Sequence, residues 1–503
     1  MLPDWLQPLF DAEEMRAADS WAIGEQDVPS IDLMERAGAG LARLTAAVAG
    51  DGPVRVVVGK GNNGGDGLVV ARLLRGEGRD VDVLATGDMS ELKGDARANL
   101  ERLPGDAPEP FEAKRLEGSG VIVDAIFGTG FEGAPREPAR GAIAAMNEAD
   151  APVVACDVPS GVNAASGEIE GEAVRAVATG TFHGSKIGLH VGPGTYHAGE
   201  VHVIEIGIPR GGPGARTAGV ISDRVLDLIP HRPRDGTKFK SGVVAIAGGA
   251  RGLTGAPTMV ALAAARAGAG YVQVAIPESI EQVVELRLLE QMTKGLPDED
   301  GAHVPDGVDG VKELAERAGA VVLGPGLGKT EGAQEFARRV AREVEAPLVI
   351  DADGLNAHAG DIESLRDRPG PTVLTPHAGE LGRLLEVESD EVNAHRLNLA
   401  RDAAERSGTI VLLKGDDSLV AKPGGPVAVS PGASPALATA GTGDVLSGVI
   451  ATFLAKGMDA FEAAAAGVLA HAHAGQEAAR RLGADHVVAG DVIDALPAAL
   501  FGP

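Results

Sequence analysis

The chain has 503 residues, a length that allows two large domains or three smaller ones. Hydrophobic residues make up 44% and charged residues 23%, which is typical of soluble globular proteins and excludes collagen-like, coiled-coil and disulfide-scaffold proteins. The net charge of −27 repels nucleic acid and anionic membrane surfaces, so we expect neither as a partner.

Three further features bound the location and the kind of site. The single cysteine, Cys156, excludes an internal disulfide framework and fits a cytoplasmic location. The most apolar stretch, residues 449–470, is interrupted by Lys456, Asp459 and Glu462, which argues against a bilayer span. The 71 glycines are about twice the usual share of roughly 7%, so we look first for tight turns that approach a ligand.

Along the chain, short β-branched runs alternate with amphipathic segments, the pattern of parallel sheets covered by helices. A first series of predicted strands begins near Val54, and a Gly- and Pro-rich linker follows over 210–219. A second series begins near Gly242 and leads into a long helical tail. We therefore predict an α/β protein with domains over 1–215 and 216–503.

The first predicted strand, 54–59, runs directly into GKGNNGGDG, and its Gly59, Gly61 and Gly64 match G-x-G-x-x-G. Such a turn lets backbone N–H groups and a helix N-terminus approach a pyrophosphate. A nicotinamide dehydrogenase and a purely structural turn both stay open on this motif alone. The polar side chains that crowd the turn indicate that more than a pyrophosphate is held there.

Two later strand ends carry acids, Asp124 in DAIFGTGF and Asp157 in CDVPSGV. Ligand sites of parallel sheets lie outside the carboxyl ends of the strands, so these loops are expected to converge. Asp124, Ser160 and Asn63 would then supply hard oxygen ligands for a monovalent or divalent cation. As isolated residues, each would instead be read as a cap or a turn.

The motifs LFDAEEMRAAD, PSIDLMERAG, GKGNNGGDGLVVARLL, DAIFGTGF, DVPSGVNAASGE and TFHGSKIGL resemble those of the NAD(P)H-hydrate epimerase family. The resemblance covers nearly all of residues 10–210 and implies a Rossmann-like three-layer domain. It implies potassium bound by Asn63, Asp124 and Ser160, and Asp157 as the acid/base residue. Lys186 is either a phosphate contact or a solvated lysine. The residues implied to bind the hydrated dinucleotide are Asn62, Asn63, Gly64, Gly65, Asp66, Gly128, Thr129, Gly130, Phe131, Glu132, Gly133, Ala134 and Asp157.

In the second half, GPGLGKT has one residue too few between its first Gly and its Gly-Lys pair for a Walker A loop, so we read a strand-end turn. AGTGDVLSGVIATFL is a better phosphate site, because Gly441, Thr442 and Gly443 present N–H groups at the start of an apolar helix. Asp444 is either a helix cap or a general base for phosphoryl transfer.

The segments GVVAIAGGARGLTGAPT, VVLGPGLG, VIDADGLNA, TPHAGELGRLL, VLLKG and AGTGDVLSG resemble the ADP- or ATP-dependent NAD(P)H-hydrate dehydratase family, which is similar in fold to ribokinase-like kinases. The resemblance covers roughly 222–500 and implies magnesium with ADP or ATP as co-substrate. The implied hydrate-binding residues are Ala256, Gly326, His377 and Asp444. The implied nucleotide-binding residues are Lys414, Gly415, Asp416, Asp417, Ser418 and Gly443.

Both halves thus point to one damaged metabolite, NADH or NADPH hydrated on the nicotinamide ring. We expect a bifunctional enzyme in which the first domain interconverts the R and S hydrates and the second dehydrates the S form. Self-association is expected because related enzymes form oligomers. The main alternative is a ribokinase-like small-molecule kinase fused to a dinucleotide-binding module, and a dehydrogenase or a non-catalytic dinucleotide sensor also stays open.

Overall fold

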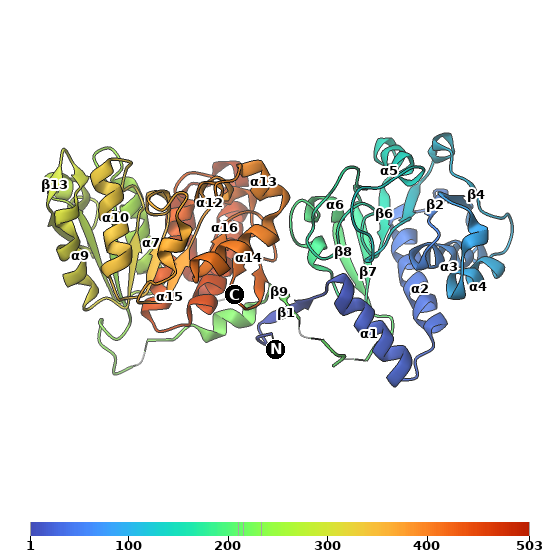
Figure 1. Cartoon of the computed structure of the whole chain (residues 1–503), viewed down its shortest axis with the longest axis horizontal. Helices are drawn as coiled ribbons and strands as arrows, with labels where there is room; N and C mark the ends of the chain where they lie inside the picture. The colour runs from blue at the N-terminus through green and yellow to red at the C-terminus, as the bar shows by residue number, and fades with distance from the viewer. Residues whose placement is uncertain (1, 210, 215, 233, 502–503) are drawn as a thin grey trace. The chain divides into compact units, whose positions relative to one another are not determined.

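The computed structural model describes residues 2–209, 211–214, 216–232 and 234–501 (Figure 1). Residues 210 and 215, inside the predicted linker, lie outside the described residues. The chain forms two compact units, one of Pro8–Gly219 and one of Pro3–Gln7 with the chain from Val220 onward. Each unit is built on its own sheet of mainly parallel strands, which confirms the predicted α/β class.

The first unit has a parallel seven-stranded sheet in the order β4-β3-β2-β5-β6-β7-β8. Because β3 and β5 lie on opposite sides of β2, the direction of winding reverses between β2 and β5. The strands are β2 Val54–Val58, β3 Val81–Ala85, β4 Glu109–Pro110, β5 Val121–Ala125, β6 Val153–Cys156, β7 Ala178–Phe182 and β8 Glu200–Ile204. The helices are α1 Ala12–Glu25, α2 Ser30–Ala49, α3 Asn62–Gly76, α4 Gly94–Glu101, α5 Ala139–Glu148 and α6 Thr195–Ala198.

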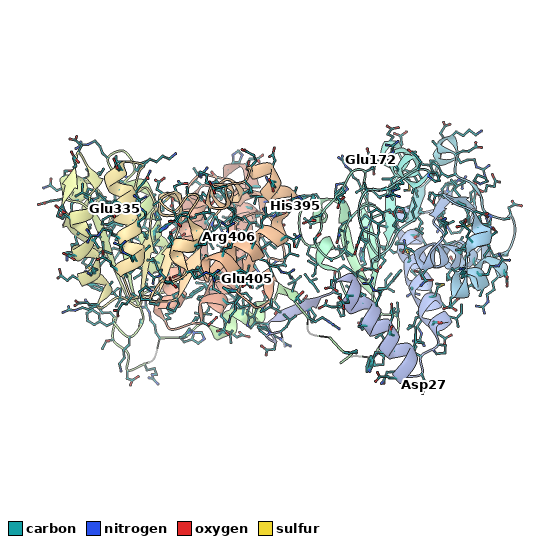
Figure 2. All side chains as sticks on the ribbon, in the orientation of Figure 1. Asp27, Glu172, Glu335, His395, Glu405 and Arg406 are labelled. Atoms are coloured by element: carbon teal, nitrogen blue, oxygen red, sulfur yellow. The ribbon has the colours of Figure 1, made fainter. Side chains whose placement is uncertain are left out.

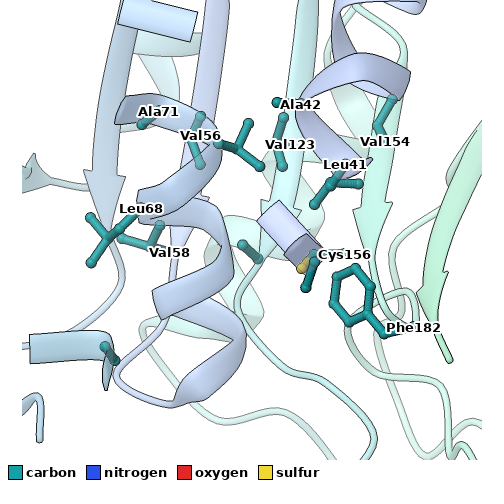
Figure 3. Packing of buried hydrophobic residues seen from close by; sticks show 14 of the residues in the cluster. Leu41, Ala42, Val56, Val58, Leu68, Ala71, Val123, Val154, Cys156 and Phe182 are labelled. Carbon is teal, nitrogen blue, oxygen red and sulfur yellow. The ribbon is translucent and has the colours of Figure 1, made fainter. Parts of the chain in front are cut away.

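Alternate residues of a strand point to opposite faces of the sheet, and helices cover the apolar side chains on both faces. Val56 and Val58 of β2 pack with Leu41 of α2 and Leu68 of α3, as Figure 3 shows. Val57, one residue between them, belongs to a separate cluster with α5 on the other face. All of these side chains are buried, and this packing holds the carboxyl ends of the strands in place.

The second unit has an eleven-stranded sheet in the order β1-β9-β20-β19-β18-β17-β16-β15-β10-β11-β12. The strands from β18 to β12 in this order are parallel to one another. Strand β19 pairs antiparallel with both of its neighbours, β18 and β20. Winding reverses between β10 and β15. The strands are β1 Leu6–Leu9, β9 Ala218–Ile221, β10 Val243–Ala247, β11 Tyr271–Pro277, β12 Met292–Leu296, β15 Ala320–Leu323, β16 Leu348–Ile350, β17 Thr372–Leu374, β18 Ile410–Leu413, β19 Leu419–Ala421 and β20 Val427–Val429, with a separate hairpin of β13 Asp298–Glu299 and β14 Ala302–His303.

Helices cover this sheet as the sequence pattern predicts, and the helical tail forms α15 to α17. The helices are α7 Gly255–Arg266, α8 Glu281–Glu285, α9 Val308–Ala315, α10 Glu331–Glu343, α11 Asp353–Asn356, α12 Ala378–Leu385, α13 Ser389–Ala394, α14 Arg396–Ser407, α15 Thr442–Ala455, α16 Ala460–Leu482 and α17 Ala489–Phe501. Within the described residues, none of the helices has the length and apolar character that crossing a membrane requires.

The N-terminal residues 3–7 belong to the second unit. The Trp5 carbonyl accepts hydrogen bonds from the Ser222 backbone N–H at 3.0 Å and from its hydroxyl at 2.7 Å. The buried Trp5 ring lies 5.4 Å from the Phe461 ring. The start of the chain therefore packs with the later half of the sequence.

Many carboxylates that produce the high net charge are exposed, including Asp27, Glu172 and Glu405, labelled in Figure 2. A solvated carboxylate costs the fold little, so these residues need no special partner. The buried carboxylates are fewer, and several of them lie at the carboxyl ends of the strands.

Candidate active sites

A cavity of about 900 Å³ opens in the first unit where the winding of the sheet reverses. Such reversals leave a crevice outside the carboxyl ends of the strands, because the two flanking loops turn to opposite sides. The loop after β2 and the loop after β5 both contribute to the wall. Of the predicted dinucleotide-binding residues, the wall includes Asn62, Asn63, Asp66, Gly128, Thr129, Gly130, Phe131, Glu132 and Asp157.

The other four predicted residues, Gly64, Gly65, Gly133 and Ala134, are not part of this wall. Gly64 is required for close packing, since a Cβ there would lie 2.1 Å from the Gly59 carbonyl oxygen. A Cβ on Gly65 would lie 2.8 Å from the Met34 Cε. Gly64 thus lets α3 start directly against the end of β2, and Gly65 lets α3 pack closely against Met34 of α2. The first residues of α3, Asn62 and Asn63, face the cavity.

The three predicted cation ligands meet around the backbone of Phe127. The Asn63 amide donates to the Phe127 carbonyl at 2.9 Å, and the Phe127 N–H donates to the Ser160 hydroxyl at 2.9 Å. That hydroxyl donates to the fully buried Asp124 carboxylate at 2.6 Å. Burial raises the pKa of Asp124 to about 6, although the Ser160 hydrogen bonds oppose this. No ion pair to Asp124 occurs within the described residues.

Asp157 is held at the cavity wall by four donors. Its Oδ1 accepts from the Lys186 ammonium at 2.5 Å, from the Thr181 hydroxyl at 3.2 Å and from the Phe182 N–H at 3.3 Å, and its Oδ2 accepts from the Thr129 hydroxyl at 2.7 Å. Its backbone adopts φ 67°, a left-handed conformation that is uncommon for a residue other than glycine. Burial alone would raise the pKa of Asp157, but Lys186 and the hydrogen bonds hold it below its usual value.

Lys186 is not a solvated lysine, because its side chain is fully buried. The ammonium donates to Asp157, to the Thr181 hydroxyl at 2.9 Å and to the Phe182 carbonyl at 2.9 Å, so all three of its hydrogens have protein acceptors. This pairing also argues against a phosphate contact, which would have to displace one of these acceptors. The sequence offered no signal for the pair, since 29 residues separate the two side chains.

In the second unit, two of the predicted hydrate-binding residues lie at the reversal between β10 and β15. Gly326 has φ 67°, and a Cβ there would lie 2.6 Å from the Leu253 carbonyl oxygen and 3.2 Å from the Ala256 Cβ. The loops after β10 and β15 therefore touch at this point. Residues 324–330, the segment GPGLGKT, connect β15 to α10, and Thr330 caps α10 by accepting from the Ala333 N–H.

Asp444 lies in the first turn of α15, within the electrostatic reach of the partly buried Lys414. Lys414 donates to Asp351 at 2.8 Å and lies 3.8 Å from the Glu380 carboxylate, and a Cβ on Gly443 would be 3.4 Å from its ammonium. The pKa of Asp444 is raised to about 7. Burial and the negative charges of Asp351 and Glu380 raise it, whereas the positive charge of Lys414 lowers it. The predicted anion site and the lysine thus form one cluster.

Sequence reasoning missed Asp351 and Ser447 in this cluster. Asp351 is 2% exposed and also accepts from the Ser447 hydroxyl at 2.8 Å. A signal was present, because Asp351 lies at the carboxyl end of the predicted strand in PLVIDADG, as Asp124 and Asp157 lie at the carboxyl ends of theirs. An acid at the end of a buried parallel strand is therefore the pattern that would have found it.

His377 follows the carboxyl end of β17 and is the N-cap residue of α12. Its Nδ1 accepts from the Gly379 N–H at 3.0 Å and from the Glu380 N–H at 3.3 Å, while Glu380 accepts from the His377 N–H at 2.9 Å. This capping box explains the three-residue spacing of the pair without a metal. The Pro376 carbonyl accepts from the Lys414 N–H at 2.8 Å, which joins this loop to the Lys414 cluster.

The predicted nucleotide loop, 414–418, uses most of its side chains to hold its own shape. Asp417 is 3% exposed and pairs with buried Arg396 at 2.8 Å. The Ser418 hydroxyl donates to the Gly415 carbonyl at 2.7 Å, and Asp416 accepts from the Ala433 N–H at 3.0 Å. Of the side chains in this loop, only that of Lys414 is placed in the Asp444 cluster.

The fold and these two strand-end clusters define a two-domain α/β enzyme. Residues 244–498 match the family model described as NAD(P)H-hydrate dehydratase, and residues 30–188 match the one described as YjeF-related protein N-terminus. The bifunctional NAD(P)H-hydrate repair enzyme of Salinibacter ruber is 41% identical over 97% of this chain and 95% of its own length. That of Moorella thermoacetica is 38% identical over 97% of this chain and 96% of its own. The chain belongs to the family of bifunctional NAD(P)H-hydrate repair enzymes.

Among solved structures, the ADP/ATP-dependent NAD(P)H-hydrate dehydratase from Bacillus subtilis, co-crystallised with ATP and Mg²⁺, is similar to part of the chain. It is 28% identical, with a TM-score of 0.48, and the match covers 55% of this chain and 95% of the Bacillus protein.

Proposed function

We propose that the protein repairs hydrated NADH and NADPH in two steps, one in each unit. The first unit interconverts the R and S hydrates, and the second dehydrates the S hydrate at the expense of ADP or ATP. The observation that carries the proposal is that each unit brings acids to a lysine at the ends of its parallel strands. Lys186 pairs with Asp157 at 2.5 Å, and Lys414 pairs with Asp351 at 2.8 Å and lowers the pKa of nearby Asp444.

In the second unit, Asp444 acts as the general base. Its pKa of about 7 lies close to neutral pH, where a carboxylate both ionises and binds a proton effectively. It removes the proton of the C6 hydroxyl, whose oxygen then takes the terminal phosphoryl group of the nucleotide. Phosphate leaves with the C6–O electron pair and takes up the C5 proton, whose C–H electron pair forms the C5=C6 double bond. The N–H groups of Gly441 to Gly443 and the Lys414 ammonium stabilise the transferred charge.

Magnesium would accompany the nucleotide and neutralise its phosphate charge. Within the described residues, no group of three or more His, Cys, Asp or Glu side chains is arranged for a metal. The nucleotide phosphates and the Glu380 carboxylate, which lies 3.8 Å from the Lys414 ammonium, would hold magnesium.

In the first unit, Asp157 is the proposed acid/base residue and the N-terminus of α3 receives the pyrophosphate. Potassium is proposed to bind Asn63, Asp124 and Ser160. The donors fit a monovalent cation, because they combine one buried carboxylate with neutral oxygens and Asp124 has no cationic side chain of its own. Potassium would neutralise Asp124 and so order the loop after β5.

Two further proposals concern the cellular location and the oligomeric state of the protein. A cytoplasmic location is supported by the single cysteine, Cys156, which is buried and free. Self-association is supported by the resemblance to the family, and light scattering on the purified chain tests it.

The test mixes the full chain, magnesium, ADP or ATP and both hydrate epimers, and follows the near-ultraviolet absorbance of reduced nicotinamide. We expect full recovery from the wild type and none from Asp444→Asn. Asp157→Ala should recover only the S fraction quickly. Full and rapid recovery by Asp157→Ala would exclude the epimerase assignment, and accumulation of a stable phosphorylated alcohol would support a small-molecule kinase instead.

A further inference from the structure

The Asp66 carboxyl group is a buried acid in the first-unit cavity that the mechanism above does not use. It lies in the first turn of α3, is 8% exposed and forms part of the cavity wall. Within the described residues, no hydrogen bond or ion pair holds its carboxyl oxygens. A buried carboxyl group without a partner carries a large desolvation penalty, so a chain that keeps one there needs a reason for it.

The surroundings of Asp66 shift its pKa in the opposite direction from that of Asp157. Burial raises the pKa of Asp66 well above its usual value, and the negative charges of Asp157 and Asp19 add to this, while Lys186 opposes it. Lys186 gives its ammonium to Asp157 and none of its hydrogens to Asp66. The surroundings therefore shift the pKa values of these two cavity carboxyl groups in opposite directions.

Other charged groups face the same cavity from neighbouring elements. They are Arg16 and Asp19 of α1, Lys60 of the loop after β2, Asp95 of α4 and Glu132 of the loop after β5. Lys60 pairs with Glu91 at 2.6 Å, so its charge is already matched. Burial also raises the pKa of Asp19, as does the charge of Asp157, whereas Lys186 lowers it.

We propose that Asp66 is a second catalytic residue of the epimerase site, the general acid that works opposite Asp157, with Lys186 as the positioning residue that keeps Asp157 as the base. This inference rests on the proposed epimerase function and assigns its proton donor. Two carboxyl groups whose surroundings favour opposite protonation states are the arrangement by which enzymes separate an acid from a base.

Asp157 and Asp66 together supply and accept all the protons that move during the epimerisation. Asp157 takes the proton of the C6 hydroxyl, C6=O forms, and the C6–N1 bond breaks with its electron pair on N1. Asp66 gives its proton to N1. Rotation about C5–C6 turns the other face of the carbonyl to N1, and the same transfers in reverse close the ring with inverted C6. Both carboxyl groups return to their starting states.

The test uses Asp66→Asn in the full chain, because Asn matches the protonated acid in shape and charge but cannot give up a proton. Purified R hydrate is supplied without nucleotide, so that the dehydratase is inactive. Formation of the S hydrate is then followed by chromatography. We expect kcat to fall by about 10²- to 10⁴-fold with KM nearly unchanged. The alkaline limb of the wild-type pH profile, where Asp66 loses its proton, should be absent from the residual activity.

Asp51→Asn, which removes an exposed carboxylate from the turn before β2, is the matched control and should keep the wild-type rate. Turnover of the S hydrate with ADP by Asp66→Asn verifies that the second unit of the variant is intact. If the wild type itself does not interconvert the epimers, the proposed function fails. If the wild type does so and Asp66→Asn keeps kcat within about threefold, or loses only affinity, Asp66 is not the acid and the epimerase assignment stands.

Discussion

Replacing Asp444 with Asn should abolish dehydration and at the same time stabilise the second unit. The carboxyl group is mostly buried at the start of α15, and its pKa is raised from 3.8 to about 7 by burial and by the charges of Asp351 and Glu380. Each unit of raised pKa corresponds to about 1.4 kcal/mol, so ionising the folded chain above pH 7 costs up to about 4 kcal/mol. Because Asp444 is partly solvated, we expect about 2–4 kcal/mol.

The sign of the effect depends on pH. A raised pKa means that the folded chain binds the proton more tightly than the unfolded chain does, so the wild type loses stability as the pH rises from about 4 to about 7. Asn never ionises, so Asp444→Asn should match the wild type near pH 4 and exceed it above pH 7. The gain corresponds to roughly 4–8 °C in Tm for a unit of this size.

The assay is thermal unfolding of the full chain at pH 4.5, 6 and 7.5, following the transition that ADP shifts. Asp367→Asn, in an exposed turn, is the control and should change Tm little at every pH. If Asp444→Asn were no more stable than the wild type at pH 7.5, or kept its whole advantage at pH 4.5, the electrostatic account of this site would be wrong.

Three further outcomes are expected. The kcat/KM of the wild type for the S hydrate should rise with pH through about 7, because Asp444 must be ionised to accept a proton, and a flat profile between pH 6 and 8 would contradict this. Lys186→Met should destabilise the first unit by about 3–5 kcal/mol in thermal unfolding by leaving Asp157 buried without its partner, and adding Asp157→Asn should restore part of the loss; equal stability of the single and double variants would count against the pair. Gly326→Ala should lower stability by about 1–3 kcal/mol and raise KM for the hydrate, because its φ of 67° and the nearby Leu253 carbonyl disfavour a Cβ, whereas Gly255→Ala, with open space around it, should do neither.

Local patterns in the sequence were sufficient to predict many of the buried strands, the turns at their ends and the family, but not strands such as β7, β12, β19 and β20. Val54–Val58 is apolar enough to be recognised as a buried strand, and the GNNGGDG turn that follows marks the start of a helix. In parallel sheets the carboxyl ends of the strands share one edge, so the sequence positions of Asn63, Asp124 and Ser160 were enough to group these residues. The contacts around Phe127 join these three residues.

Only the tertiary structure decided which charged group pairs with which. Lys186 could be described from the sequence as a phosphate contact or a surface lysine, yet it lies buried against Asp157. Asp417 belongs to the predicted nucleotide loop, yet its carboxylate is held by Arg396. The physical reason is that the protonation state and the partner of a buried group depend on the distances to groups from other strands and helices, and the order of residues along the chain does not contain those distances.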